Sequence, residues 1–298
     1  MQIFDAHCDT ASELLNKGQS LDKNGLHIDV ARLNRYKSFT QVFAAFIAPE
    51  YYGAPMERAE KIICNFLEEA KRNDITVCKS YGDWEQAKTK VKAFISLEGG
   101  EPIESISDLK KLYGMGVRLI APTWNFRNRI ACGVGEVEDT GLTSFGREVI
   151  CEMDRLGIIL DVSHLSEKSF WQAVECINRP VLASHSNLRG VKDNKRNLKD
   201  SQFLKLKETG GVCGINLYPP FLGDNIADVV SHIDRFLSLG GEDNIGLGCD
   251  FDGVDMLPEG VCGVQDLDKI IKSLPYSIEI KEKIAYKNFI RVIKSHNC

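Results

Sequence analysis

The sequence predicts an α/β fold and, within that class, a TIM-like (β/α)8 barrel. Candidate strands and helices alternate along nearly the whole chain, in about eight strand–helix units. Several candidate strands are short, continuous apolar runs, as is typical of parallel strands buried on both faces. The 298 residues suit one barrel plus extensions, and no linker divides them, so we expect a single domain over 1–298. A doubly wound open sheet is the alternative arrangement.

The expected elements follow one another regularly. Strands are expected at 2–5, 41–48, 91–97, 116–120, 157–161, 180–183, 211–216 and 245–249. Helices are expected at 56–72, 107–113, 143–156, 200–208, 226–239, 265–273 and 278–294, with one more capped by Ser166. The glycine-rich stretch 122–142 is irregular and has the length of a functional loop.

Potential metal ligands come directly after five of the predicted strands. They are His7 and Asp9 after the first, Glu98 after the third, His164 after the fifth, His185 after the sixth and Asp250 after the last. In a (β/α)8 barrel the carboxyl ends of the strands converge on one face, where active sites are built. Three of the six histidines in the chain fall at these positions. The pattern therefore predicts a metal site in the barrel mouth.

The residue types limit the chemistry of this site. Imidazoles and carboxylates suit Zn²⁺, Mn²⁺, Co²⁺ or Fe²⁺ rather than a structural cysteine site. A carboxylate such as Glu98, between two sets of ligands, can bridge two metals about 3.5–4 Å apart. Two metals sharing one water lower the pKa of that water towards about 7, so that hydroxide is available at neutral pH. Asp250, expected at the opposite side of the mouth, would orient the hydroxide and shuttle its proton.

Each candidate ligand also has a structural interpretation, as a turn residue or a helix cap. The His-x-Asp pattern at 7–9, for example, recurs at 27–29. His27 follows no apolar strand and leads into a helical turn, so we interpret it as structural or surface-exposed. His232 on an amphipathic helix and His296 at a frayed C-terminus are interpreted in the same way. For the strand-end residues, their shared position favours the metal site.

Composition excludes several classes of partner. Hydrophobic residues make up 43% and charged residues 27% of the chain, ordinary values for a soluble enzyme. The formal net charge of −5 gives no reason to expect a nucleic acid or an anionic membrane as partner. We see no signal peptide and no membrane-spanning run, so we expect no membrane anchor and a cytoplasmic location. The ten cysteines contain no C-x-x-C and are expected to be reduced thiols.

Beyond these local patterns, the sequence resembles the membrane (renal) dipeptidase family of amidohydrolase-type metallopeptidases. The resemblance extends over nearly the whole chain in order and approximate spacing. It is carried by DAHCDT at 5–10, SLEGG at 96–100, DVSHLS at 161–166, ASHS at 183–186, KRN at 195–197, GLGCDFDG at 246–253 and IAYKNFIR at 284–291. It implies a metal-dependent hydrolase barrel with two Zn²⁺ per chain that hydrolyses dipeptides.

The same resemblance implies roles for the ligand candidates. His7 and Asp9 match the ligands of one zinc, and Glu98 matches the bridging ligand. His164 and His185 match the ligands of the other zinc.

Two further residues match the family's substrate contacts. Arg196 matches the arginine that holds the substrate's terminal carboxylate, a role for which a guanidinium is suited. Without the family, the basic loop 189–199 would be interpreted as a solvated run of charges. Asp250 matches the acidic residue that engages the substrate's amino end and serves proton transfer.

One departure from the family pattern concerns the oxyanion. Where mammalian members carry a histidine thought to stabilise it, this chain reads Pro122-Thr-Trp-Asn, with Trp124 at the position. Asn125 could donate a hydrogen bond to the oxyanion instead, or a metal could stabilise it alone. Trp124 could equally form an apolar wall for a substrate side chain.

The sequence thus predicts a binuclear zinc dipeptidase in which a metal-bridging hydroxide attacks the peptide carbonyl and Asp250 delivers a proton to the leaving amine. The alternatives are another amidohydrolase reaction on the same scaffold, acting on an N-acyl amino acid or a cyclic amide, and a catalytically silent barrel used for binding. Related proteins are often dimers, so a homodimer is one expected assembly.

Overall fold

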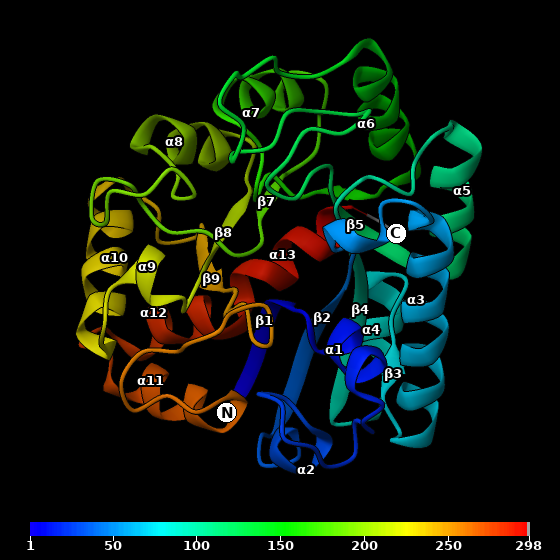
Figure 1. The fold of residues 1–298 in the computed structure, drawn as a ribbon. Helices are drawn as coiled ribbons and strands as arrows, with labels where there is room; N and C mark the ends of the chain where they lie inside the picture. The colour runs from blue at the N-terminus through cyan, green and yellow to red at the C-terminus, as the bar shows by residue number, and fades with distance from the viewer. Residues whose placement is uncertain (297–298) are drawn as a thin grey trace.

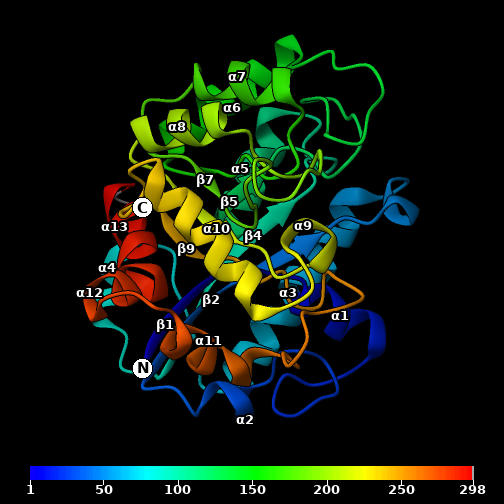
Figure 2. The same cartoon turned by 90° about the vertical axis from the view of Figure 1, so that its left-hand side faces the viewer.

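A computed structural model describes residues 1–296 as a ring of eight parallel strands surrounded by helices (Figures 1 and 2). Around the ring lie β1 (Gln2–Cys8), β2 (Ser38–Phe46), β4 (Val91–Glu98), β5 (Val117–Ala121), β6 (Ile159–Leu160), β7 (Leu182–Ala183), β8 (Val212–Ile215) and β9 (Ile245–Leu247). β1 pairs with both β2 and β9, and a parallel bridge from Asp161 to Leu182 joins β6 to β7. The barrel is therefore nearly closed, and the open-sheet alternative is wrong.

The helices pack around this ring (Figure 1). They are α1 (Thr10–Lys17), α2 (Val30–Leu33), α3 (Pro55–Arg72), α4 (Tyr81–Gln86), α5 (Ile106–Met115), α6 (Ser144–Leu156), α7 (Glu167–Val174), α8 (Asp200–Glu208), α9 (Pro219–Leu222), α10 (Ile226–Ser238), α11 (Leu267–Ser273), α12 (Ile278–Glu282) and α13 (Asn288–Ser295). Short 3-10 turns cover Pro49–Tyr51 and Val264–Asp266, and a π-helical turn, Lys283–Lys287, joins α12 to α13.

Several elements differ from the sequence prediction. The strands β6 and β7 have only two residues each, because the chain leaves the ladder early to form the polar turns at the mouth. The helical turn expected after His27 is α2. The short helices α1, α4 and α9 and the two-residue strand β3 (Thr76–Val77) were not predicted. These pieces are too short to show a periodic apolar pattern, so they escaped it. The predicted loop at 122–142 is confirmed as irregular.

Capping residues determine where several of the helices begin and end. Ser105 and Asp108 form a reciprocal capping box at the start of α5. The Ser166 side chain accepts a hydrogen bond from the backbone N–H of Ser169 and caps α7, as predicted. Gly157, in the left-handed conformation, ends α6 directly before β6.

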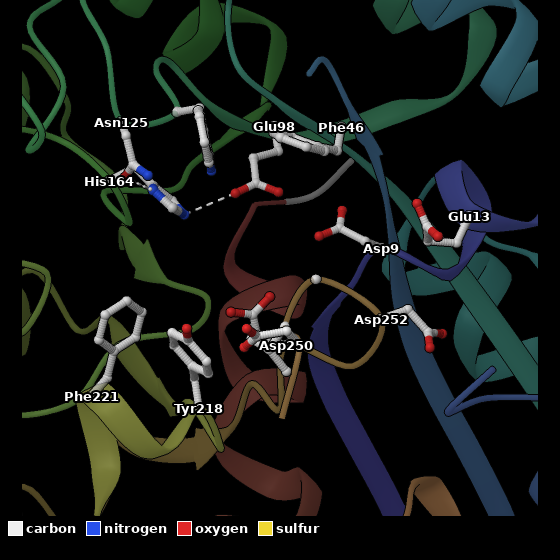
Figure 3. A pocket seen from close by; sticks show the side chains of 14 residues that line it. Asp9, Glu13, Phe46, Glu98, Asn125, His164, Tyr218, Phe221, Asp250 and Asp252 are labelled. Atoms are coloured by element: carbon white, nitrogen blue, oxygen red, sulfur yellow. Dashed lines mark hydrogen bonds and ion pairs between the residues drawn. The ribbon is translucent and has the colours of Figure 1, made fainter. Parts of the chain in front are cut away.

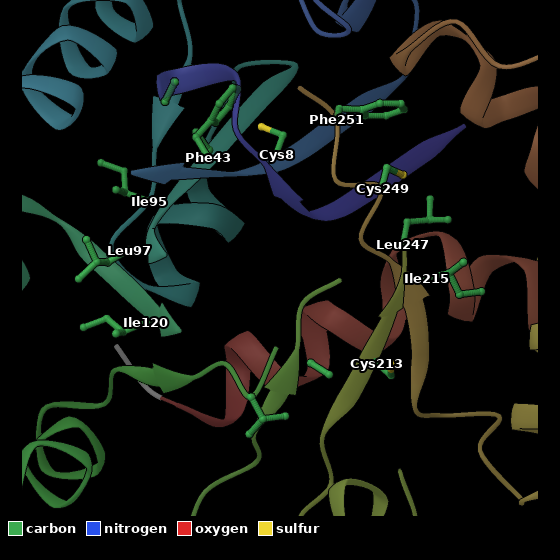
Figure 4. Packing of buried hydrophobic residues seen from close by; sticks show 14 of the residues in the cluster. Cys8, Phe43, Ile95, Leu97, Ile120, Cys213, Ile215, Leu247, Cys249 and Phe251 are labelled. Carbon is green, nitrogen blue, oxygen red and sulfur yellow. The ribbon is translucent and has the colours of Figure 1, made fainter. Parts of the chain in front are cut away.

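The barrel interior is filled by apolar side chains from seven of the strands. These inward residues are Phe4, Ala6, Val42, Phe94, Leu119, Ile159, Leu182 and Val212, with two of them on β1. Phe289 of α13 stacks on Phe4 with ring centroids 5.2 Å apart, and Gly246 of β9 leaves the space that this ring occupies. Alternate positions, such as Ile95, Leu97, Ile215 and Leu247, pack in the larger core between strands and helices (Figure 4). The inward residues and Phe289 together form an apolar plug inside the barrel. Polar side chains that could take part in a reaction therefore lie at the carboxyl end of the strands.

One prediction about the chain end is wrong. His296 is not frayed: it is 1% exposed, and its Nδ1 lies 3.0 Å from the carbonyl oxygen of Val292. Arg179 donates a hydrogen bond to the His296 carbonyl oxygen. Tertiary contacts therefore hold this end of α13, which spacing along the chain could not reveal.

Candidate metal centre

A cavity of about 440 Å³ opens at the carboxyl end of the strands (Figure 3). Its walls combine acidic, aromatic and histidine side chains. The lining residues are Asp9, Glu13, Phe46, Glu98, Trp124, Asn125, His164, Tyr218, Phe221, Asp250, Asp252, Gly253, Val254 and Asp255. The predicted strand-end residues are thus gathered around one concave space, with His7 and His185 buried beneath it at 1% exposure each.

A β-bulge in β1 sets the direction of His7. The register between β1 and β2 shifts between Asp5 and Cys8, which inserts an extra residue there. The Asp5 carboxylate accepts a hydrogen bond from the backbone N–H of Cys249, just after β9, and so links the bulged strand to the neighbouring segment. His7 therefore faces the mouth although its neighbour Ala6 already points into the barrel.

Glu98 lies between two groups of ligands. One of its oxygens is 3.2 Å from His7 Nε2. The other is 2.9 Å from His164 Nε2, a contact drawn as a dashed line in Figure 3. The set His7, Asp9 and Glu98 and the set Glu98, His164 and His185 each bring ligand atoms within 4.8 Å of one another. The two sets share Glu98 alone, which is the geometry that a bridging carboxylate requires.

The donor atoms themselves fit a cation. His7 Nε2, Asp9 Oδ1 and Glu98 Oε2 are buried without a hydrogen-bond partner, an arrangement that is costly unless something positive lies between them. His164 Nε2 and His185 Nε2 approach to 2.9 Å. The Nδ1–H of His164 donates to Asn125 Oδ1 at 2.9 Å, which leaves a lone pair on its Nε2.

Burial and mutual charge shift the pKa values across the centre. Burial, together with the nearby Arg196 cation, lowers the pKa of His164 to about 4. Burial, together with His7, lowers the pKa of His185 well below its usual value. Both imidazoles are therefore neutral at pH 7, the form that binds metal. Burial and the neighbouring Glu98 charge raise the pKa of Asp9 to about 7, as expected of carboxylates that lack a compensating cation.

Asp250 belongs to the same cluster and does not lie across the mouth from the first ligands. Its Oδ1 is 3.8 Å from His7 Nε2, because β9 and β1 are neighbours in the barrel. Asn216 donates to its other oxygen at 2.8 Å. Burial raises the pKa of Asp250 despite the opposing effect of His7. Asp250 also adopts a left-handed backbone conformation, φ 62°, a strained geometry typical of functional turns.

Arg196 is buried at 6% exposure, which excludes the interpretation of its loop segment as wholly solvated charge. It donates to Ser186 Oγ at 2.9 Å and to the His185 carbonyl oxygen at 3.0 Å, while its Nε has no partner. Its side chain does not line the main cavity but a separate space of about 20 Å³ behind His164. Arg196, the arginine predicted to bind substrate, therefore contacts the metal centre through the His185 backbone, on the side of His164 that faces away from the main cavity.

Trp124 and Asn125 take different places in the cavity. Trp124 packs against Phe46, with ring centroids 5.4 Å apart, and forms part of the apolar wall. Asn125 uses its oxygen to hold His164, so only its amide nitrogen remains available as a donor to a ligand.

The sequence interpretation missed several wall residues. They are Glu13, Phe46, Tyr218, Phe221, Asp252 and Asp255. Most lie in the segments that follow β1, β2, β8 and β9, a position that could have marked them.

His27 and His232 lie outside the metal centre. The Nδ1 atom of His27 accepts a hydrogen bond from the backbone N–H of Asp252. His232 is fully buried, and its Nδ1 accepts a hydrogen bond from the backbone N–H of Leu188. Both histidines hold backbone in place.

Fold and site together define a barrel hydrolase of the metal-dependent class. A family model described as membrane dipeptidase (peptidase family M19) matches residues 1–297. The chain therefore belongs to the membrane dipeptidase family, and it is an enzyme of the metallo-dipeptidase kind.

Two curated relatives are similar to most of the chain. An uncharacterized protein from the pqqA 5′ region of Klebsiella pneumoniae is 34% identical over 241 residues, 74% of this chain and 89% of the relative. An uncharacterized dipeptidase of Schizosaccharomyces pombe is 29% identical over 303 residues, 90% of this chain and 72% of the relative.

Solved structures show the same architecture. The crystal structure of dipeptidase AC, a metallopeptidase, superposes with a TM-score of 0.92 at 26% identity and covers 100% of this chain and 99% of its own. A metallopeptidase of Rhodobacter sphaeroides, bound to a phosphinate mimic of the dipeptide L-Ala-D-Ala, gives 0.89 at 25% identity, with 99% of each chain covered. Among the described residues, no helix is both long and apolar enough to cross a membrane.

Proposed function

We propose that the protein is a binuclear zinc dipeptidase that cleaves the single peptide bond of free dipeptides. The observation that carries this proposal is the placement of Glu98. Its two carboxylate oxygens face two different histidines, His7 and His164, and its Oε2 atom has no hydrogen-bond partner. His7 and Asp9 would hold one zinc, His164 and His185 the other, and Glu98 both. Two bound zinc ions would supply hydroxide at neutral pH and polarise the peptide carbonyl.

The chain's own residues then position the dipeptide and move the proton. Asp250, with its raised pKa, accepts the proton of the attacking water and delivers it to the leaving amine nitrogen. The amide nitrogen of Asn125 donates a hydrogen bond to the developing oxyanion. Arg196 binds the substrate's terminal carboxylate through its unpaired Nε. For Arg196 to bind the carboxylate, its guanidinium must be reachable from the main cavity past His164.

The first experiment measures zinc by mass spectrometry beside the hydrolysis of a dipeptide panel with L- and D-residues at the second position. About two zinc ions per chain, with turnover abolished when the terminal carboxylate is amidated, are the expected result. Glu98→Gln should lose zinc or turnover. A fully active Glu98→Gln enzyme would overturn the bridging role.

The same panel tests the runner-up reaction. Since Arg196 lies behind the cavity wall, a substrate without a free carboxylate, such as an N-acyl or cyclic amide, is the competing class. Two zinc ions without dipeptide cleavage, and unimpaired turnover of such an amide by Arg196→Ala, would replace the dipeptidase proposal. A chain that binds no zinc and cleaves neither class would favour a silent barrel.

We also propose a cytosolic, reduced environment and a homodimeric assembly. The nine cysteines among the described residues are all free thiols, a state that fits the cytosol. Cell fractionation tests the location, and sedimentation of the zinc-loaded enzyme tests the dimer.

A further inference from the structure

A buried carboxylate behind the metal centre has no part in the proposed reaction. Asp161 follows β6 and is 3% exposed. Its Oδ1 accepts hydrogen bonds from the backbone N–H groups of Ser163 at 3.0 Å and Ser184 at 2.9 Å. Its Oδ2 accepts a hydrogen bond from the Ser184 hydroxyl. The carboxylate thus receives three hydrogen bonds from the turns that carry His164 and His185.

The Ser184 hydroxyl determines which nitrogen of His185 carries the proton. Ser184 Oγ lies 2.7 Å from His185 Nδ1. A hydroxyl has one proton, and an ionised Asp161 can only accept, so that proton goes to Asp161. Ser184 Oγ must then accept from the Nδ1–H of His185. The imidazole is left with a lone pair on Nε2, the atom that lies 3.7 Å from Glu98 and 2.9 Å from His164 Nε2.

We propose that Asp161 and Ser184 are positioning residues that hold His185 in the tautomer able to bind metal. The inference rests on the proposed zinc site. It adds the reason why His185 carries its proton on Nδ1 and leaves Nε2 free for the metal. Hydrogen-bonded partners of this kind fix ring orientation and tautomer in metal centres generally. His164 reaches the same state by a different route, through the Asn125 amide.

An isosteric substitution separates this role from simple packing. In Asp161→Asn the amide oxygen can still accept from both backbone N–H groups, so the turns keep their support. The amide nitrogen, however, donates to Ser184 Oγ, and the Ser184 proton turns towards His185 Nδ1. His185 must then carry its own proton on Nε2, where the metal should bind. We expect zinc affinity at one of the two sites to fall by roughly 10–100-fold.

The test is competition between the whole, zinc-loaded chain and a chelator, followed by metal analysis. At a chelator concentration where the wild type keeps two zinc ions, Asp161→Asn should keep about one. Ser184→Ala removes the hydrogen bond without imposing the wrong tautomer, so its loss should be smaller. The double variant Asp161→Asn/Ser184→Ala should bind zinc like Ser184→Ala, better than Asp161→Asn alone. Additive losses of zinc in the double variant would overturn the proposed relay, meaning the hydrogen-bond chain from Asp161 through Ser184 to His185.

Nitrogen NMR of the zinc-stripped chain reads the tautomer directly. The wild type should show His185 protonated on Nδ1, and Asp161→Asn should show it protonated on Nε2. The same tautomer in both proteins would refute the inference even if zinc affinity fell. A wild type without zinc but with the expected tautomers would refute the proposed function and leave the relay standing.

Ser186→Ala is the matched control. Ser186 is also a buried hydroxyl beside this cluster, but it accepts from Arg196 and does not contact His185 Nδ1. Zinc retention should stay at the wild-type level, while KM for dipeptides should rise. A Ser186→Ala protein that lost zinc as readily as Asp161→Asn would show that any disturbance of this cluster weakens the site, and would count against the relay.

Discussion

The six histidines show how far a residue's role depends on what its ring nitrogens face. Those at 7, 164 and 185 turn Nε2 towards Glu98. The histidines at 27, 232 and 296 instead lie against backbone amides or carbonyls. Because neutral imidazole offers one donor and one acceptor, the backbone partners on both ring nitrogens of His232 satisfy it without a metal.

His232 makes stability depend on pH. Its Nδ1 accepts from the Leu188 N–H at 3.2 Å, so Nε2 donates to the Leu222 carbonyl oxygen at 3.1 Å. Burial lowers the pKa of His232 to about 4, against 6.5 when unfolded. Between these values only the unfolded chain takes up the proton, so the stabilising effect is complete above pH 6.5 and is lost as the pH falls towards 4. From pH 6.5 to 5 we expect a loss of about 2 kcal/mol from this residue.

Urea unfolding of the wild type and His232→Asn at pH 7 and pH 5 measures this contribution. Asparagine can keep an acceptor near Leu188 but does not titrate. The variant should be less stable at pH 7 and should lose less stability on acidification. Equal losses in the two proteins would rule out His232 as the source.

Asn125 combines two tasks that substitutions can separate. Its Oδ1 accepts from His164, and its amide nitrogen is proposed to serve the oxyanion. Asn125→Asp keeps an acceptor and loses the donor, so zinc should remain while kcat falls by about 10²–10³-fold. Asn125→Leu loses both, and zinc affinity should fall by roughly 10–100-fold as well. Steady-state kinetics beside zinc titration distinguishes them, and full activity in Asn125→Asp would assign the oxyanion to other groups.

At the scale of elements, a glycine on β8 and another directly after β9 allow the chain to approach the turn before His185. A Cβ at Gly248 would lie 1.7 Å from the Ser184 carbonyl oxygen, and one at Gly214 would lie 2.1 Å from the same atom. Backbone oxygen cannot move aside as a flexible side chain could. The strands therefore need glycine here for the turn to keep its place.

Gly248→Ala should destabilise the fold by about 1–3 kcal/mol, the usual cost of overpacking. It should also weaken zinc binding, because the displaced carbonyl belongs to the residue beside His185. Gly114→Ala in α5 is the control: a Cβ there meets no atom within 4 Å, and alanine suits a helix. Urea midpoints compare the two, and a Gly248→Ala protein as stable as Gly114→Ala would contradict the packing argument.

At the scale of the whole molecule, the candidate metal centre joins four of the eight barrel strands. Its proposed ligands lie at or just beyond the carboxyl ends of β1, β4, β6 and β7, and the last two strands are joined by a single bridge. Bound metal would therefore link β6 and β7, the two neighbouring strands that share only this one bridge. It would also compensate Asp9 and Glu98, which burial otherwise leaves without enough partners.

Zinc should accordingly stabilise the fold by mass action. At free zinc 100-fold above Kd, the expected gain is about 2.7 kcal/mol per site. Calorimetry of zinc-loaded and chelator-treated protein measures it as a rise in Tm. In Glu98→Gln most of this rise should disappear, and an identical Tm with and without zinc in the wild type would argue against metal at this centre.

The sequence by itself determined the barrel and the positions of the proposed ligands. Alternating apolar runs and helical patterns are local, and a ligand directly after a strand is carried to the mouth by the strand itself. For this reason His7, Asp9, Glu98, His164 and Asp250 could be located without a structure.

The tertiary structure alone decided which groups support those ligands. The bulge that aims His7, the Asp161 carboxylate beside Ser184, the Asn125 oxygen on His164 and the α13 plug all join segments distant in the chain. No periodic pattern encodes such contacts, because each depends on where two separate turns meet after the barrel has closed.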